Sequence, residues 1–289
     1  MNPPSSPTVA CLGPEGSFSH EFALAHFGQV SILCIEPNFE DVISKVQDGT
    51  CSHAVLPLLN SSGVSVKPVQ TALGKHRDSL RVEGCFLHYV YHSIVAGPHF
   101  SSLKMLLSKE QVFPQCSKWF EANSGVMTQE APSTSAALKQ VLELDEEAQR
   151  STAAICNKLA HNLYGGTVIE SNIQNPNNQT LFLVVSLTPP KNTDEQLLVC
   201  LTCPTDDCYQ RALEDFGMAN FPVKFSSMKG NFSAESPLYL QLANEGNFED
   251  FLTEVGKPHR TWIGSFSTEE SLSSCVERFF DDDLLDYSN

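Results

Sequence analysis

The stretch VACLGPEGSFSH, residues 9–20, starts as an apolar run, turns at a glycine and continues into small and polar residues. Val9 to Leu12 has the length and character of a buried strand, and Glu21 to Phe27 has the spacing of an amphipathic helix. A strand, a glycine-containing turn and a helix in immediate succession are typical of α/β folds, in which helices cover the faces of a sheet. This segment therefore predicts an α/β fold.

The same alternation of short apolar strands and amphipathic helices continues toward the C-terminus. Apolar side chains at helical spacing predict a helix at residues 39–46, between strands at 32–35 and 54–56. A second set of elements runs from about Phe86 to Val168. It is predicted to contain a strand at 87–96 and helices at 114–123, 135–142 and 153–163, and a buried strand at 181–186 follows it. Strands that alternate with helices favour a largely parallel sheet.

A domain boundary is expected at residues 188–195, TPPKNTDE, because two prolines and several polar residues offer nothing to bury. The elements predicted beyond it are strands at 196–203, 223–228, 236–242 and 261–266, and helices at 206–216 and 248–255. Their order is βαββαβ. The predicted domains are residues 8–188 and 196–280, and the acidic residues 281–289 form a solvated tail.

Composition and charge narrow the classes of function. A formal net charge of −16 opposes binding to nucleic acid or to anionic membranes, which both need a basic surface. The N-terminus lacks the features of a signal peptide, and no apolar run approaches the roughly 20 residues that span a bilayer. We expect a cytoplasmic protein without a membrane segment. Cys200, Cys203 and Cys208 lack a fourth ligand nearby in sequence, so no metal site is predicted.

Hydroxyl side chains precede helical patterns in three segments, at Ser17, between Ser108 and Gln111, and between Ser133 and Ser135. Such hydroxyls cap the free N–H groups at a helix start, and the same N–H groups can instead hold a carboxylate. Both readings stay open for each segment. An anionic ligand of so acidic a protein must be held by local donors of this kind.

Polar residues also lie at two strand ends. Asn60 and Ser61 follow the strand at 54–56, at the end where open α/β sheets bind ligands, although a plain turn is the alternative. Thr180 leads directly into the buried run 181–186, which would hold it rigidly.

Five motifs in order resemble the prephenate dehydratase family. Residues 11–20 are similar to that family's opening LGPEGTFSH. The family's VPIENS, SHPQALxQC, serine-threonine and N-x-TRF segments resemble, in turn, Leu56 to Ser61, Ser108 to Cys116, Ser133 to Ala137 and Asn178 to Phe182.

This resemblance implies a catalytic domain of two lobes, similar to periplasmic binding proteins, with the site in the cleft between them. The lobes would be residues 8–84 with 165–188, and residues 85–164. Family members convert prephenate to phenylpyruvate with loss of carbon dioxide and water, using neither metal nor organic cofactor. A donor must then assist departure of the ring hydroxyl, which is general-acid work with electrostatic support.

The resemblance also implies roles for single residues. Thr180 takes the position of the family's catalytic threonine, and Phe182 packs behind the site. The residues implied to hold the carboxylates and hydroxyl of the substrate are Ser17, Asn60, Ser61, Gln111, Ser133, Thr134 and Ser135.

Several positions depart from the family pattern. Leu181 replaces an arginine and Leu59 a glutamate, Cys85 stands where Gly-Glu is usual, and Lys109-Glu110 replaces His-Pro. One lost desolvated charge contact typically costs about 2–5 kcal/mol. Non-aromatising prephenate decarboxylases, which keep the ring hydroxyl, resemble this chain in lacking the arginine, so that activity is the alternative to dehydration. Lys109, His20 and His88 are candidates to replace the arginine.

The predicted C-terminal domain resembles the ACT domains that sense phenylalanine in dehydratases and usually pair their sheets side by side. This implies a homodimer or homotetramer and an amino-acid effector site. The stretches at Asp206–Leu213 and Phe225–Lys229 differ from the family's Gly-Ala-Leu and Glu-Ser-Arg-Pro segments, and Glu235-Ser236-Pro237 comes too late to match. Control by phenylalanine is therefore an open question.

Two other classes compete with a lyase. An inactive sensor of small anions would also fit lobes that have lost an arginine and a glutamate. A hydrolase lacks support because no G-x-S-x-G elbow or other local nucleophile motif occurs.

Overall fold

The computed structural model describes residues 6–28, 32–61, 66–76, 79–187, 196–202, 223–226, 237–243 and 260–266. The chain forms two compact units. One consists of Met1–Val42 and His88–Thr180, and the other of Ile43–Leu87 and Leu181–Asn289. The chain passes from the first to the second within α2 (Phe39–Gln47). The two predicted lobes of the N-terminal domain stay a prediction.

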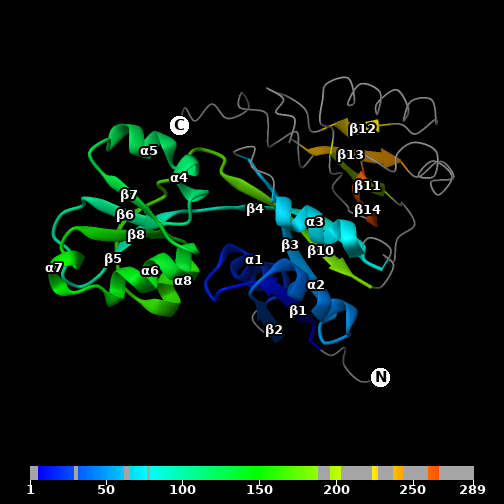
Figure 1. Cartoon of the computed structure of the whole chain (residues 1–289), viewed down its shortest axis with the longest axis horizontal. Coiled ribbons are helices and arrows are strands. Elements are labelled where there is room, and N and C mark those ends of the chain that lie inside the picture. Colours follow the sequence, from blue (N-terminus) through cyan, green and yellow to red (C-terminus); the bar gives the residue numbers. More distant parts are fainter. Residues whose placement is uncertain are drawn as a thin grey trace. The chain divides into compact units, whose positions relative to one another are not determined.

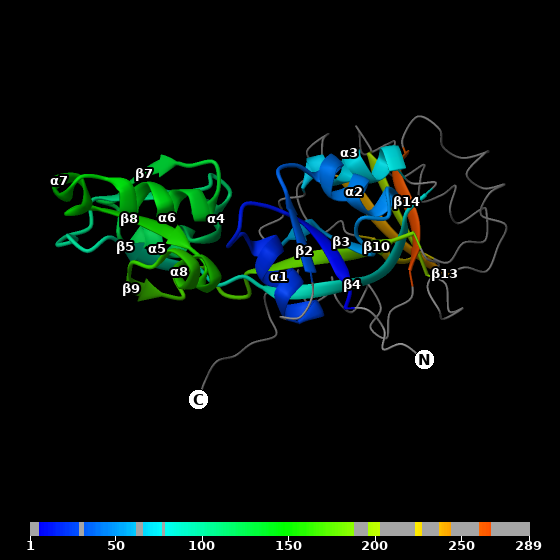
Figure 2. The ribbon, with the colours of Figure 1, turned by 90° about the horizontal axis from the view of Figure 1, so that it is seen from below.

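The first unit opens with the predicted strand, turn and helix. β1 (Thr8–Leu12) pairs in parallel with β2 (Ile32–Glu36), and α1 (Phe18–Phe27) lies beside β1 (Figure 2). Phe22 and Ala23 form the buried side of α1. The helix begins three residues earlier than predicted, because Ser17 caps it, and it ends at Gly28 in a left-handed conformation (φ +85°).

A second sheet of the first unit has the strand order β7-β6-β8-β5-β9. Its strands are β5 (Ser93–Ala96), β6 (Met105–Ser108), β7 (Met127–Glu130), β8 (Thr152–Cys156) and β9 (Thr167–Ser171). β6 pairs in parallel with β7 and β8, whereas β5 pairs antiparallel with β8 and β9. The expectation of a largely parallel sheet is therefore wrong for this sheet, which is mixed.

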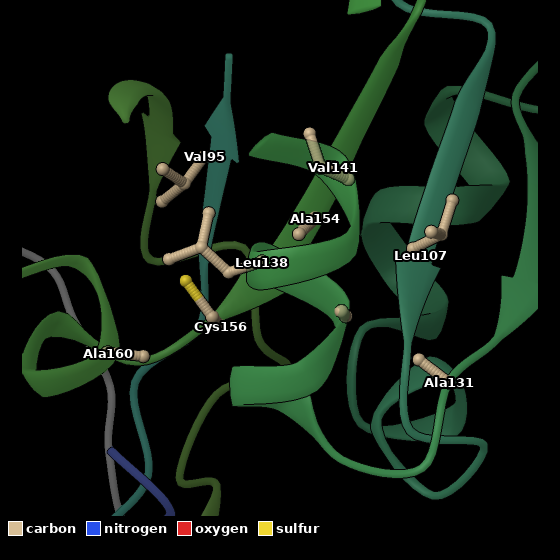
Figure 3. Close-up of a cluster of buried hydrophobic side chains, with 9 residues drawn as sticks. Val95, Leu107, Ala131, Leu138, Val141, Ala154, Cys156 and Ala160 are labelled. Atoms are coloured by element: carbon tan, nitrogen blue, oxygen red, sulfur yellow. The ribbon is translucent and has the colours of Figure 1, made fainter. Parts of the chain in front are cut away.

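Helices cover both faces of this sheet (Figure 1). α6 (Thr134–Glu143) and α8 (Lys158–Tyr164) pack on one face, and α4 (Val112–Gln115) and α5 (Ser117–Ala122) on the other. α7 (Glu146–Gln149) precedes β8. Figure 3 shows the core on the first face, with Leu138 of α6 beside Val95 of β5 and Cys156 of β8.

The helix predicted at residues 153–163 is wrong in its first half and confirmed in its second. Residues 152–156 form β8, in which every side chain is buried, and the helix starts only at Lys158, after Asn157. Alanine-rich apolar runs fit a helix and a fully buried strand equally well, and periodicity alone cannot separate them. The predicted strand at 87–96 is likewise two strands, β4 (Arg81–Tyr89) and β5, and the predicted helix at 114–123 is α4 followed by α5.

The second unit holds β3 (His53–Asn60), α3 (Lys67–His76), most of β4 and most of β10 (Gln179–Ser186). These strands belong to the five-stranded sheet that contains β1 and β2, whose strand order is β2-β1-β3-β10-β4. β10 lies between β3 and β4, and its side chains are buried except for partly buried Thr180. Central position and burial explain the unbroken apolar run from Leu181 to Val185 within it.

The C-terminal strands form a separate sheet. They are β11 (Gln196–Thr202), β12 (Val223–Ser226), β13 (Pro237–Ala243) and β14 (Arg260–Phe266), in the order β12-β13-β11-β14. β13 pairs antiparallel with both β11 and β12, and β11 pairs antiparallel with β14, so β11 and β12 run parallel with β13 between them. Parallel strands need a crossover, as in the predicted βαββαβ order. The predicted helices at 206–216 and 248–255, the linker at 188–195 and the tail at 281–289 lie outside the described residues.

Candidate functional site

The turn before α1 is held by Ser17. Its hydroxyl donates to the carbonyl of Leu12 at 2.7 Å and accepts from the N–H of His20 at 3.2 Å. Both bonds stay within the strand, the turn and the helix. Ser17 therefore acts as a helix cap in this structure. Of the two alternatives that the sequence left open, capping and carboxylate binding, this is the first.

His20 is fixed by the same turn. The N–H of Gly16 donates to Nδ1 of His20 at 3.0 Å, and because an N–H can only donate, the ring proton must be on Nε2. Burial lowers the pKa of His20, outweighing the neighbouring carboxylates of Glu15 and Glu21, which raise it. Nε2 of His20 bonds to no protein group in the described part of the chain, so it is an available neutral donor.

The start of α6 carries the predicted serine-threonine segment. The hydroxyl of Ser133 accepts from the N–H of Ala136 at 3.0 Å and caps the helix. Ser135 is fully buried, and its Oγ has no hydrogen-bond partner among the described residues. The N–H groups of Thr134 and Ser135 also bond to no described group. Unpaired buried donors are costly, which indicates that an acceptor is missing here.

The start of α8 supplies a residue that sequence analysis missed. Asn157 is fully buried and caps α8, with its Oδ1 accepting from the N–H of Ala160 at 2.8 Å. Its Nδ2 has no partner in the residues that the structure describes. An asparagine ahead of a helix is a recognisable signal, but the erroneous helix at 153–163 hid it.

These three segments meet at Gly16. A methyl group added at Gly16 would lie 3.1 Å from Oγ of Ser135 and 3.0 Å from Cα of Ala160. The hydroxyl of Tyr164, at the end of α8, donates to the carbonyl of Glu15 at 2.9 Å and ties the turn to that helix. The hydroxyl of Ser135 and the amide of Asn157 thus belong to helix starts that both border the turn. Such a group of donors suits a carboxylate.

A Gly16→Ala substitution is expected to lower the free energy of unfolding by about 1–3 kcal/mol, because its backbone is left-handed (φ +78°) and the methyl group has no room. The measurement is urea denaturation. Gly49→Ala is the matched control, since Gly49 has the same φ of +78° and no atom within 4 Å of the added methyl group. Equal losses in the two variants would contradict the close contact at Gly16.

The third predicted segment, Ser108 to Gln111, does not provide a helix start capped by a side chain, unlike the other two. Ser108 is buried and donates to the carbonyl of Ile155 at 3.0 Å, so its hydroxyl supports β8. Nζ of Lys109 lies 3.5 Å from a carboxylate oxygen of Glu130. Gln111 is exposed ahead of α4 and its side chain caps nothing. The four-residue α4 is too short to provide a helix start that binds an anion.

Thr180 lies at the beginning of β10, partly buried, as the sequence predicted. Asn60 and Ser61 lie at the end of β3, the first buried and the second partly buried. Phe182 is 1% exposed. Asn60, Ser61 and Phe182 belong to the second unit, and their convergence with the segments around Gly16 stays a prediction.

The prephenate dehydratase family model matches residues 9–190, more than half of the chain. The chain belongs to the prephenate dehydratase family. A bifunctional chorismate mutase/prephenate dehydratase from Enterobacter agglomerans is 31% identical over 186 residues, which are 62% of this chain and 46% of that protein. The chain thus spans about half the length of the curated relatives it matches.

Solved structures show the same fold. A prephenate dehydratase from Arthrobacter aurescens in complex with L-Phe has a TM-score of 0.69 at 20% identity, with 90% of each chain covered. GqqA, described as a novel type of quorum quenching acylase, has a TM-score of 0.63 at 19% identity and covers 90% of this chain and 98% of its own. At these identities the likeness concerns the fold alone.

One departure from the family pattern has a clear structural setting. Leu181 is 1% exposed in the core. Because successive side chains of a strand point to opposite faces, Leu181 lies on the face of β10 opposite to Thr180. The exchange of arginine for leucine therefore fits a buried apolar position. The side chains of Leu59 and Cys85 lie outside the described residues.

Neither a cluster of metal-ligating side chains nor a membrane-spanning helix occurs among the described residues. No group of three or more His, Cys, Asp or Glu side chains there could hold a metal ion, and Cys203 and Cys208 lie outside them. No described helix has the length and apolar character to cross a membrane.

Proposed function

We propose that this chain is a lyase that converts prephenate to phenylpyruvate, with loss of carbon dioxide and water. The observation that carries the proposal is the retention of Thr180 at the rigid start of β10, in a chain of the prephenate dehydratase family. The Thr180 hydroxyl would donate to the departing ring hydroxyl while the ring carboxylate leaves as carbon dioxide. The electrons of the breaking carbon–carbon bond make the ring aromatic.

The donors around Gly16 would hold a carboxylate of the substrate. The hydroxyl of Ser135, the amide of Asn157 and the first N–H groups of α6 have no described acceptor, and a carboxylate would satisfy them. Uncharged donors suffice for this task. They also explain how a protein with a net charge of −16 could hold a dianion without a basic surface.

The remaining predicted residues complete the proposed site. Asn60, Ser61 and Gln111 would position the second carboxylate and the ring hydroxyl, and Phe182 would pack behind Thr180. Ser17 and Ser133 would act mainly as caps that hold the helix starts in place. Neither metal nor organic cofactor is required by this chemistry.

A non-aromatising prephenate decarboxylase is the second candidate. Leu181 favours it, because the arginine of the dehydratase motif is absent and no cation at this position can pair with a substrate carboxylate. Burial of Leu181 on the face opposite to Thr180 weakens this argument, since an arginine there would start from the core side of β10.

The deciding experiment incubates the purified full chain with prephenate near neutral pH. Phenylpyruvate absorbance is followed while mass spectrometry records all products, and a sample without protein corrects for spontaneous decay. Phenylpyruvate formed above that sample establishes the dehydratase. A product that lacks carbon dioxide but keeps the hydroxyl establishes the decarboxylase, and binding without turnover would leave the anion sensor.

We further propose that the C-terminal β11–β14 sheet forms an ACT-like domain that pairs two chains and binds an amino acid. Its strand order supports this, and the Arthrobacter aurescens structure contains L-Phe. Light scattering of the full chain with and without phenylalanine would test both points. A monomer that does not bind phenylalanine would refute them.

A further inference from the structure

His92 is a fully buried residue that the proposed chemistry does not use. It lies between β4 and β5, and its ring packs edge-on against Phe18, the first residue of α1, with ring centroids 5.2 Å apart. Its backbone N–H donates to Oε1 of Gln174 at 2.9 Å, and its carbonyl accepts from the N–H of Ile173 at 3.1 Å. His92 therefore connects the start of α1 with the segment that leads to β10.

The ring of His92 also contacts α4. Its Nε2 lies 2.9 Å from Oε1 of Gln115, which also accepts from Nδ2 of Asn178 at 3.0 Å. Because this oxygen can only accept, Nε2 of His92 carries a proton. Burial lowers the pKa of His92 to about 4, so the ring stays neutral at neutral pH.

Asn178, which bonds to Gln115, lies directly before β10, the strand that contains Thr180. Its carbonyl accepts from the N–H of Val90 at 2.8 Å, and its Nδ2 donates to the carbonyl of Val90 at 3.2 Å. Asn177, just before it, has a left-handed backbone (φ +57°). Asn178 is thus fixed through both its backbone and its side chain, two residues before Thr180.

A second asparagine holds the same turn from the other side. Oδ1 of Asn175 accepts from the N–H of Lys118 at 3.1 Å, at the start of α5, and its N–H donates to the carbonyl of Gln115 at 2.6 Å. Gln115 is therefore bonded to the turn through both its carbonyl and its side chain. Gln115 is the last residue of α4, and Gln111 precedes the first residue of the same helix, about one helical turn away.

We propose that Gln115 is a positioning residue, which through its bonds to His92 and Asn178 holds Thr180 in register with Gln111 and with the start of α1. The three segments joined by this network are those of Ser17, Gln111 and Thr180, and all lie within the first unit. A shift of about 1 Å in a reacting group can cost roughly 100-fold in rate. The inference rests on the proposed lyase function, but its effect on Thr180 can be measured without turnover.

The test compares Gln115→Met, which keeps the length but removes the acceptor, with Gln115→Glu, which keeps an acceptor for both donors. Gln115→Met is expected to lower kcat for prephenate on the order of 100-fold with KM changed less than about threefold. Gln115→Glu is expected to retain kcat within about threefold. Hydrogen exchange of the peptide covering residues 175–186 should accelerate at least about tenfold in Gln115→Met, because Asn178 loses its hydrogen bond to the Gln115 side chain.

Gln149→Met is the matched control. Gln149 is a buried glutamine whose side chain, like that of Gln115, takes part in two hydrogen bonds. Its Nε2 donates to the carbonyls of Leu142 and Leu144 at 3.1 and 2.9 Å, and it takes no part in the proposed site. It should lose stability while keeping kcat and slow exchange at residues 175–186.

The results separate failure of this proposal from failure of the proposed function. If wild-type protein does not turn over prephenate, the lyase proposal fails and hydrogen exchange alone decides the role of Gln115. Unchanged exchange at residues 175–186 in Gln115→Met overturns it in either case. With an active wild type, a loss of kcat no greater than that in Gln149→Met overturns it as well.

Discussion

Thr180→Val is expected to lower kcat for prephenate on the order of 10²- to 10⁴-fold, the share of rate that a positioned proton donor contributes. Valine has nearly the shape of threonine, so the fold of β10 should persist and KM should change less than about threefold. The hydroxyl acts only as the carbon–oxygen bond breaks, which is why the loss falls on kcat. Stopped-flow or steady-state recording of phenylpyruvate measures it.

The control is Thr167→Val, a matched exchange at an exposed position of β9. It should leave kcat within about twofold. If Thr180→Val retains wild-type activity, Thr180 is not the donor and the dehydratase mechanism given above is wrong. If the wild-type product keeps its hydroxyl, the protein is the decarboxylase and no donor to that hydroxyl is needed. The rate of Thr180→Val should then equal that of the wild type.

Ser135→Ala is expected to weaken prephenate binding by about 10- to 100-fold, which corresponds to the 1.5–3 kcal/mol of a hydrogen bond to a charged group. Stability should stay equal or rise, because the hydroxyl of Ser135 is buried without a described partner in the free protein. The measurements are calorimetric titration with prephenate and urea denaturation. Binding and stability thus move in different directions.

Ser133→Ala serves as the comparison, two residues away. The hydroxyl of Ser133 caps α6, so its removal should cost about 1 kcal/mol of unfolding free energy. Its effect on prephenate binding should be the smaller of the two. A Ser135→Ala variant that is destabilised but binds prephenate normally would show that the buried hydroxyl serves the fold and not a ligand.

Much of the candidate site could be predicted from local sequence. Ser17 and Ser133 were identified as residues ahead of helices because capping depends on neighbours within a few positions. Thr180 was placed at a strand entrance because the apolar run of five residues that follows it in β10, Leu181 to Val185, has a clear beginning. Asn157 was missed for a local reason too, since the buried run before it was interpreted as helix.

The sequence alone determined the alternation of strands and helices, the family motifs and the residue types available for chemistry, because propensity, capping and periodicity act over a few residues. Only the tertiary structure decided that Ser135 and Ala160 meet Gly16, and that Gln115 joins His92 to Asn178. These residues are far apart in the chain. Their contacts depend on strand order and on how helices pack over the sheet, and therefore on the whole fold rather than on any segment of it.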